Sequence, residues 1–318
     1  MRVVVTGAAG FIGSTVADTL LAAGHDVVGI DCFTPYYDED RKRSNLPGGD
    51  RFDPVEVDLR TGELEPLLDD ADAVVHEAAQ PGVRLSWSSG FGDYVSHNVL
   101  ATQRLLEAAV AVGCPRLVYA SSSSVYGQAP RYPTTEDDLP APHSPYGVTK
   151  LAAEHLCGLY AANWGLSTVS LRYFTVYGPR QRPDMAMHRL LSAGLSGTAF
   201  PLYGDGSAVR DFTFVADVAA ATIAATTADV APGAVLNVAG GAETTMTDLL
   251  ALAGEVLGAE IRVERHEGQP GDVARTGGSI ARTTQALGWE PKVGLEEGLR
   301  AHADWLRRRG TAGGQNRG

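Results

Sequence analysis

The chain has 318 residues, enough for one large domain or two moderate ones with a well-buried core. It carries 26 Lys and Arg against 38 Asp and Glu, a formal net charge of -12, which argues against general binding to nucleic acid or to an anionic membrane. The hydrophobic fraction of 44% and the charged fraction of 20% are ordinary for a water-soluble globular protein. Any anionic ligand must therefore be held by local donors.

Three widely spaced cysteines, Cys32, Cys114 and Cys157, indicate neither a disulfide framework nor a metal site, so a reducing cytoplasm is the simpler expectation. His76-Glu77 lacks the second histidine of a zinc helix, because position 80 is Gln80. The chain opens directly on an apolar strand pattern, and no apolar run approaches the ~20 residues that span a bilayer. We expect an unprocessed cytoplasmic protein that needs no metal and no membrane.

The amino-terminal stretch has the pattern of strand, glycine turn and helix. The β-branched run at 2–5 stops at TGAAGFIGS, and helical spacing follows. Gly7 and Gly10 would let the backbone approach a pyrophosphate at the helix N-terminus, and Gly13 would let the helix pack closely on the strand. The pattern predicts a dinucleotide site.

The next strand, HDVVGID, ends at Asp31, where a carboxylate would accept hydrogen bonds from the ribose hydroxyls of adenosine. An acid at this position repels a 2′-phosphate, so we expect NAD rather than NADP, although Arg41, Lys42 and Arg43 downstream weaken the inference. Asp58 ends the following strand, PVEVDL. It could bond the adenine edge or be an exposed loop carboxylate.

Nearly continuous apolar strands alternate with helical segments, which is typical of a parallel sheet covered on both faces. We predict an α/β protein with a Rossmann-type doubly wound parallel sheet and a smaller α/β substrate-binding region on the carboxyl-terminal side. The expected NAD-binding domain is 1–174, with segments from about 212–240 returning to it. The substrate region is 175–306, and 307–318 is expected to be a flexible tail.

Two later features sit where an open α/β sheet places its ligands. Four serines, 121–124, follow the apolar strand PRLVYAS, and strand carboxyl ends line the ligand crevice. Tyr146 and Lys150 are four residues apart, so on a helix they share one face. A cation beside a phenol favours the phenolate, which makes the pair suitable for proton transfer.

Taken together, these motifs resemble the extended short-chain dehydrogenase/reductase family, the NAD-dependent nucleotide-sugar epimerases and dehydratases. The resemblance covers about residues 1–306 and rests on TGAAGFIG, VDL, HEAAQ, SSSSVYG, SPYGVTK, LRYFTVYGP and GDGSAVRDF. It implies a Rossmann domain that binds NAD and a carboxyl-terminal region that binds a nucleoside diphosphate sugar.

The resemblance also implies roles for individual residues. The expected cofactor contacts are Gly7, Gly10, Phe11, Ile12, Gly13, Asp31, Asp58, Leu59, Ala78, Ala79, Asn98, Tyr146, Lys150 and Tyr173. The expected catalytic residues are Tyr146, Lys150, Ser122 and Ser123, with Ser122 and Tyr146 at the sugar 4-hydroxyl and Lys150 on the nicotinamide ribose. Arg210 matches a contact to the UDP pyrophosphate, and Asp272 one to the uridine ribose.

Two sequence features distinguish the reactions and substrates of the members of this family. Dehydratases and decarboxylases carry acidic residues just before the VYG, where this chain has Ser123 and Ser124. Neutral hydroxyls orient a ligand but are poor acids and bases. The two serines therefore favour C4 epimerisation. The run TVYGPRQRPDMAMHRLL resembles UDP-glucuronate 4-epimerases, whereas UDP-glucose 4-epimerases have Asn in place of Thr175. Arg182, helped by Thr175, could bind the C5 carboxylate.

The prediction is therefore NAD-dependent interconversion of UDP-glucuronate and UDP-galacturonate through a 4-keto intermediate. A UDP-glucose 4-epimerase, a UDP-glucuronate decarboxylase and an NAD-sensing binding protein of the same fold stay open, although a sensor has no use for the Tyr146 and Lys150 pair. The resemblance suggests a homodimer through helices near 95–112 and 147–163. Glu77 departs from the family pattern, because an apolar residue is commoner there, and Cys32 replaces a usual Asn.

Overall fold

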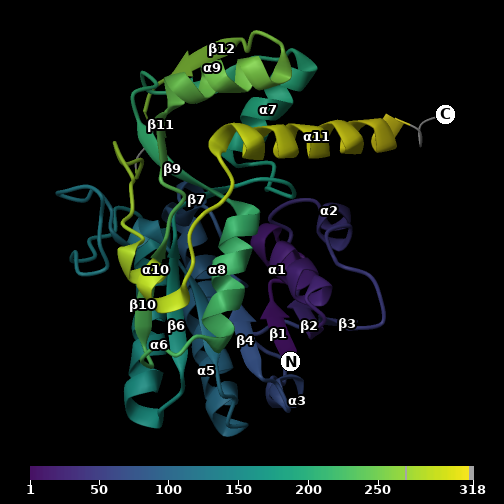
Figure 1. The fold of residues 1–318 in the computed structure, drawn as a ribbon, viewed down its shortest axis with the longest axis vertical. Coiled ribbons are helices and arrows are strands. Elements are labelled where there is room, and N and C mark those ends of the chain that lie inside the picture. Colours follow the sequence, from purple (N-terminus) through teal and green to yellow (C-terminus); the bar gives the residue numbers. More distant parts are fainter. Residues whose placement is uncertain (269–270, 315–318) are drawn as a thin grey trace.

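A computed structural model describes residues 1–268 and 271–314 of the chain. A seven-stranded sheet, parallel throughout, forms its centre, with the strand order β10-β6-β5-β4-β1-β2-β3 (Figure 1). The strands are β1 (Arg2–Thr6), β2 (Asp26–Asp31), β3 (Phe52–Glu56), β4 (Ala73–His76), β5 (Leu117–Ser122), β6 (Thr168–Tyr173) and β10 (Ala234–Val238). The order reverses between β1 and β4, which opens a ligand crevice at the carboxyl ends of the strands.

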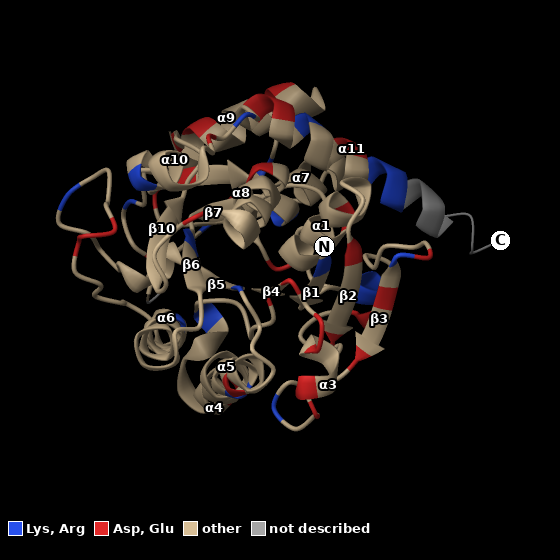
Figure 2. Cartoon of the chain, turned by 60° about the horizontal axis from the view of Figure 1, so that its bottom comes forward, with Lys and Arg blue, Asp and Glu red and all other residues tan. Residues whose placement is uncertain are grey.

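Two layers of helices cover the sheet (Figure 2). α1 (Phe11–Ala22), α8 (Val215–Thr227) and α10 (Ala281–Leu287) pack on one face, and α3 (Glu65–Leu68), α5 (Ala101–Ala111) and α6 (Pro145–Trp164) pack on the other. The central strands bury apolar side chains on both faces, as Val3, Val4 and Val5 show with no exposed surface. The predicted α/β, doubly wound fold is confirmed.

The helix expected near 95–112 is part of one continuous helical run with an irregular middle. It begins with α4 (Phe91–Tyr94), continues as a π-helical segment (Val95–Leu100) and ends as α5. A π turn changes which side chains face inward, and it does so at Asn98. The short helix α2 (Glu39–Arg43) lies before β3.

The smaller region stands over the carboxyl ends of the large sheet (Figure 1). It contains a three-stranded sheet of β11 (Ala242–Thr245), β9 (Val209–Phe214) and β7 (Thr175–Tyr177), and a pair of β12 (Val263–His266) with β8 (Phe200–Tyr203). Its helices are α7 (Ala186–Ser196), α9 (Met246–Leu257) and α11 (Leu295–Gly314). A separate apolar core joins the three helices to these strands.

The chain passes between the two regions more than once. α8 and β10 carry residues 215–227 and 234–238 back into the large sheet and its helical layer. α11 continues to Gly314, so the structure differs from the expected flexible tail over 307–314, and 315–318 lie outside the described residues. Within 1–268 and 271–314, no helix combines the length and apolarity needed to cross a membrane.

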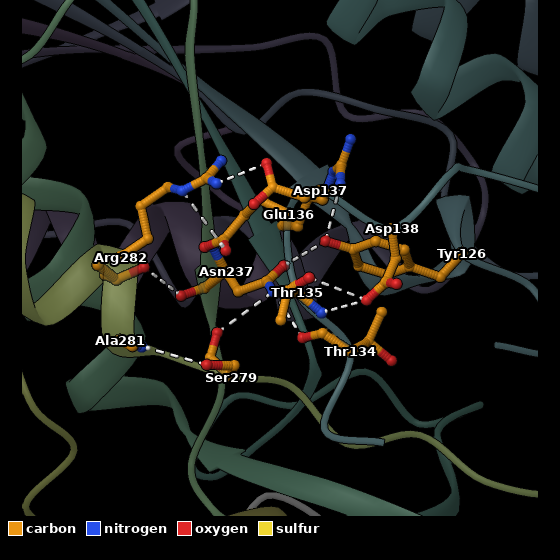
Figure 3. Close-up of polar contacts among 12 residues, drawn as sticks. Tyr126, Thr134, Thr135, Glu136, Asp137, Asp138, Asn237, Ser279, Ala281 and Arg282 are labelled. Atoms are coloured by element: carbon orange, nitrogen blue, oxygen red, sulfur yellow. Dashed lines mark hydrogen bonds and ion pairs between the residues drawn. The ribbon is translucent and has the colours of Figure 1, made fainter. Parts of the chain in front are cut away.

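A polar network fixes the segment that follows the serine run (Figure 3). The Asn237 amide nitrogen donates to the carbonyls of Thr134 (3.1 Å) and Ser279 (3.3 Å), while its oxygen accepts from the Tyr126 hydroxyl at 2.8 Å. The backbone N–H of Asn237 donates to Glu136 at 2.8 Å. One buried side chain on β10 thereby joins the loop after β5 to the carboxyl-terminal segment.

Candidate active site

A hollow of about 1140 Å³, which includes space open to solvent, lies at the carboxyl ends of the large sheet. We call it the cofactor cavity. Thirteen of the fourteen cofactor contacts predicted from the sequence line it: Gly7, Gly10, Phe11, Ile12, Gly13, Asp31, Asp58, Leu59, Ala78, Ala79, Tyr146, Lys150 and Tyr173.

The glycine turn forms the floor of the cofactor cavity, with no room for side chains. Gly7 has φ +68°, and a Cβ built on it would lie 2.7 Å from the Ala78 backbone nitrogen. A Cβ on Gly13 would lie 2.2 Å from the Gly7 carbonyl oxygen. Gly10 precedes α1 without any side-chain cap, so the first backbone N–H groups of the helix are available to an anion. This cradle fits a pyrophosphate.

Carboxylates lie at the ends of β2 and β3. Asp31 accepts from the backbone N–H of Ala9 at 3.1 Å and of Phe33 at 2.9 Å, which fixes its side chain at the cavity wall. Asp58 also lines the cavity, but it forms an ion pair with Arg60 at 2.6 Å, and the hydrogen bonds from Arg60 lower the pKa of Asp58. Asp58 is therefore both a cavity residue and a paired loop carboxylate.

Two of the three basic residues that weakened the preference for NAD, Lys42 and Arg43, have side-chain partners in the structure. Lys42 Nζ donates to the carbonyl and the hydroxyl of Thr34, the latter at 3.0 Å. Arg43 forms ion pairs with Glu39 at 2.7 Å and Glu56 at 2.9 Å. Lys42 lines the cofactor cavity together with its partner Thr34, so the expectation of NAD over NADP rests on Asp31.

Tyr146 lies at the start of α6, whose N-cap Ser144 accepts from the Gly147 backbone at 3.1 Å. Burial raises the pKa of Tyr146, while a hydrogen bond with Ser122 and the nearby Arg182 guanidinium lower it. We expected Lys150 to be the cation that lowers this pKa; in the structure that cation is Arg182. Tyr146 and Arg182 thus lie together at the cavity wall, whereas Ser122, the hydrogen-bond partner of Tyr146, does not line the cavity.

Lys150 lies one turn further along α6, with Nζ 4.6 Å from the centre of the Tyr119 ring. Burial lowers the pKa of Lys150 to about 8, partly offset by the carboxyl group of Glu77. The position at the cavity wall suits a hydrogen bond to a cofactor ribose.

Arg182 enters the cofactor cavity from the smaller region, and its side chain is only 17% exposed. Its Nε and Nη2 donate to the two carboxylate oxygens of Asp184, each at 3.0 Å. The guanidinium lies 5.6 Å from the centre of the Tyr36 ring, and Tyr36 also donates to Asp184 at 3.3 Å. These contacts orient Arg182 next to the Tyr146 phenol.

A second hollow of about 630 Å³ brings together four more predicted residues. We call it the substrate hollow; Ser123, Thr175, Arg210 and Asp272 all line it. Burial lowers the pKa of Arg210, and Asp272 forms an ion pair with Arg84 at 3.2 Å. The serine run connects the two hollows, since Ser121 lines the cofactor cavity and Ser123 and Ser124 line the substrate hollow. The structure therefore separates Thr175 and Arg182, which we expected to act together, onto two sides of this connection.

Asn98 is the predicted cofactor residue that does not line the cofactor cavity. It is buried, accepts from the Gln80 backbone N–H at 2.7 Å, and donates to Thr149 at 3.0 Å and to the Gln80 carbonyl at 3.1 Å. A direct contact between Asn98 and NAD stays a prediction. Asn98 holds the segment after β4 against α6.

The sequence analysis did not assign several residues that line the cofactor cavity, among them Tyr36, His97 and Glu77. Tyr36 lies in the segment DCFTPYY, which belongs to none of the motifs quoted above. Glu77 had been noted only as a departure from the family pattern. Glu77 lines the cavity together with Tyr146 and Lys150.

Residues 3–239, about three quarters of the chain, match the family described as NAD dependent epimerase/dehydratase family. The chain belongs to this family. This membership, the parallel sheet and the glycine cradle confirm the predicted fold, family and NAD cofactor.

Individual relatives cover almost the whole chain. The "Uncharacterized UDP-glucose epimerase YtcB" of Bacillus subtilis is 39% identical over 94% of this chain and 96% of its own, and the UDP-glucose 4-epimerase of Mycolicibacterium smegmatis is 38% identical over 96% and 99%. The crystal structure of UDP-glucuronic acid 4-epimerase from Bacillus cereus, in complex with UDP-glucuronic acid and NAD, is 40% identical with a TM-score of 0.94, covering 97% of this chain and 100% of that one. Together they support an NAD-dependent 4-epimerase of UDP-sugars.

Proposed function

We propose that this enzyme interconverts UDP-glucuronate and UDP-galacturonate by transient oxidation at C4. The observation that carries the proposal is the position of Arg182, a nearly buried guanidinium beside the Tyr146 phenol at the wall of the cofactor cavity. The Asp184 pair uses Nε and Nη2, so the donors of Nη1 are on the other side of the guanidinium. They suit the C5 carboxylate of a uronate.

In the proposed reaction, the Tyr146 phenolate takes the proton of the 4-hydroxyl and returns it after the sugar has turned its other face. Arg182 and the hydrogen bond with Ser122 both favour this phenolate. NAD, when bound, accepts the hydrogen of C4 and gives it back. Lys150 would hold the nicotinamide ribose, and Arg210 with Asp272 would hold the UDP moiety in the substrate hollow.

The residues before Val125 favour epimerisation over the other reactions of the family. Ser123 and Ser124 line the substrate hollow, and their hydroxyls can orient a sugar without removing a proton from C5. A 4-keto uronate is a β-keto acid that can lose CO2, so the site must hold its carboxylate away from the geometry of that loss. Arg182, with Thr175 on the opposite side of the sugar, would supply this hold.

UDP-glucose is the second candidate substrate, favoured by the names of the two sequence relatives. Incubation of the purified protein with UDP-glucuronate, and separately with UDP-glucose, followed by NMR of the products, separates the candidates. The proposal predicts UDP-galacturonate as the main product with little UDP-pentose. Turnover of UDP-glucose alone would assign the neutral sugar, and a UDP-pentose product would assign a decarboxylase.

We also propose a homodimer through α5 and α6. The π segment and α6 carry apolar side chains on their exposed surface, among them Leu100 (47% exposed), Val148 (49%) and Leu159 (52%). Such a surface suits a second copy of the same helices. Light scattering on the purified protein should give twice the mass of the chain, and Leu159→Glu should reduce it to one; a monomer at all concentrations would contradict the proposal.

A further inference from the structure

Glu77 is an acid at a place where the reaction described above assigns none. It follows β4 directly, and its backbone packs against the glycine turn, since a Cβ on Gly7 would lie 3.0 Å from the Glu77 carbonyl carbon. Its side chain lines the cofactor cavity at the same end as Tyr146 and Lys150. Glu77 is half-buried, and the surface that it exposes faces this cavity.

A chain of three hydrogen bonds holds the carboxyl group. Glu77 Oε1 lies 2.8 Å from the Tyr173 hydroxyl, which lies 2.7 Å from the Thr222 hydroxyl. Thr222 in turn lies 2.8 Å from the Val218 carbonyl. Tyr173 and Thr222 are buried, so this chain runs from the cavity wall into α8 without contact with bulk solvent.

The hydroxyls of this hydrogen-bond chain can be paired in both charge states of Glu77. If Glu77 is protonated, it donates to Tyr173, Tyr173 donates to Thr222, and Thr222 donates to the Val218 carbonyl. If Glu77 is ionised, Tyr173 donates to it and Thr222 turns to donate to Tyr173. Both states leave the hydroxyls paired, so when Glu77 exchanges a proton with the solvent of the cavity, rotation of two O–H groups restores the hydrogen bonds.

The groups that face Glu77 come from three elements. They are Lys150 and Tyr146 on α6, Tyr173 on β6 and Tyr119 on β5. Burial raises the pKa of Glu77 to about 7, against the lowering effects of the Tyr173 hydrogen bond and of Lys150. Burial therefore brings the pKa of Glu77 up and that of Lys150 down towards neutral, and each of the two charges favours the other.

We propose that Glu77 sets the charge at the nicotinamide end of the cofactor cavity, so that the oxidised dinucleotide is held in preference to the reduced one. The inference rests on the proposed function, because that function places the nicotinamide beside Tyr146 and Lys150. The oxidised ring carries a positive charge and the reduced ring carries none. A carboxylate in this partly enclosed cavity favours the charged ring by about tenfold in affinity or more.

The preference has a use in an epimerase. The enzyme must begin each cycle with oxidised cofactor, and a bound reduced dinucleotide without keto sugar is a dead end. An anion beside the ring strengthens the binding of the oxidised form and so disfavours the dead-end form relative to it. The apolar residue that is commoner at this position in the family would leave the task to other groups.

The test compares the two affinities rather than turnover. NAD+ and NADH binding would be measured by calorimetry and by NADH fluorescence on protein freed of dinucleotide, for the wild type, Glu77→Gln and Glu77→Leu. At pH 8 the ratio of the NADH to the NAD+ dissociation constant should fall about tenfold in both variants. Glu107→Gln is the matched control, because Glu107 also accepts from a tyrosine hydroxyl, that of Tyr160, but lies outside the cofactor cavity.

The pH dependence gives a second readout. As the pH falls through about 7, Glu77 in the wild type becomes neutral and the ratio should approach that of Glu77→Gln. Removal of the Glu77 charge also lowers the pKa of Lys150, so the change that Lys150 causes should move to lower pH in both Glu77 variants. An unchanged ratio in both Glu77 variants, with both dinucleotides still bound, overturns the inference and leaves the proposed function standing. A wild-type protein that binds neither dinucleotide overturns both.

Discussion

The cofactor cavity and the substrate hollow are built in different ways. The cavity is formed mainly where successive strands of the parallel sheet end, so short local motifs position most of its residues. The hollow combines the serine turn after β5, Thr175 of β7, Arg210 of β9 and the segment around Asp272. Cofactor identity is therefore encoded locally, whereas the choice of sugar depends on how distant segments meet.

The contact between Tyr146 and Ser122 is the most sensitive place to test. Tyr146→Phe removes the phenol that links Ser122 to Arg182, and turnover should fall at least ~100-fold, the lower end for loss of a general base. Dinucleotide binding and the melting temperature should stay close to wild type, because the ring remains. Near-normal turnover would remove Tyr146 from the proton-transfer role.

NAD binding can be weakened by a substitution that leaves the substrate hollow unaltered. Gly13→Ala would place a methyl group 2.2 Å from the Gly7 carbonyl, so the turn must move, and NAD affinity should fall about tenfold or more. Gly48→Ala is the matched control, since a Cβ there meets no atom within 4 Å. Calorimetric titration of both proteins with NAD checks the prediction; equal affinities would show that the turn is not close-packed around the cofactor.

The sugar side can be altered while the cofactor stays bound. Arg182→Ala should lower kcat/KM for UDP-glucuronate about tenfold or more relative to UDP-glucose, because only the uronate loses a charge-assisted hydrogen bond. Arg180→Ala is the control, since Arg180 pairs with Asp18 at 2.6 Å and does not line the cofactor cavity. Equal losses on both sugars would make Arg182 a general contact.

The two regions also differ in their buried histidines. In the large domain, His76 is hydrogen-bonded on both ring nitrogens, to Thr6 at 2.8 Å and Thr102 at 2.9 Å. In the smaller region, His302 is buried, and neither of its ring nitrogens has a hydrogen-bond partner among the described residues. Burial lowers the pKa of His302 to about 3.

The unfolded chain therefore binds a proton at His302 at a higher pH than the folded protein does, and stability falls as the pH drops below about 6.5. The contribution of this one group is about 1.4 kcal/mol per pH unit between that point and its folded pKa. His302→Leu should flatten the acid limb of the unfolding free energy measured in urea. His155→Gln, at an exposed position of α6, should leave the limb unchanged. An identical slope in His302→Leu would contradict the pKa direction.

Most of the fold and the cofactor cavity could be predicted, because each motif reports its own local geometry. The glycines, Asp31 and the Tyr146–Lys150 spacing require only that a strand, a turn or a helix forms where the pattern indicates it. The same local logic failed for residues 307–314, where α11 continues in place of the expected flexible tail.

The rest depended on contacts between distant segments. Asn98 faces Gln80 and Thr149 because a π segment interrupts the helix, and no spacing rule in the sequence marks that interruption. Arg182, not Lys150, acts on the Tyr146 pKa because the smaller region folds back over the sheet. The sequence showed Glu77 only as a departure from the family pattern. Its hydrogen-bond partners lie on β6 and α8, so only the fold brings them together.

The central claim is that C4 of the sugar is oxidised and then reduced with inverted configuration, and that the same hydrogen leaves C4 and returns to it. UDP-glucuronate labelled with deuterium at C4 tests it most directly, with the product examined by NMR and mass spectrometry. The account predicts UDP-galacturonate that keeps the deuterium at C4, because the hydrogen that leaves the sugar returns to it. Inversion with loss of the label to water, or no inversion at C4, would contradict the account.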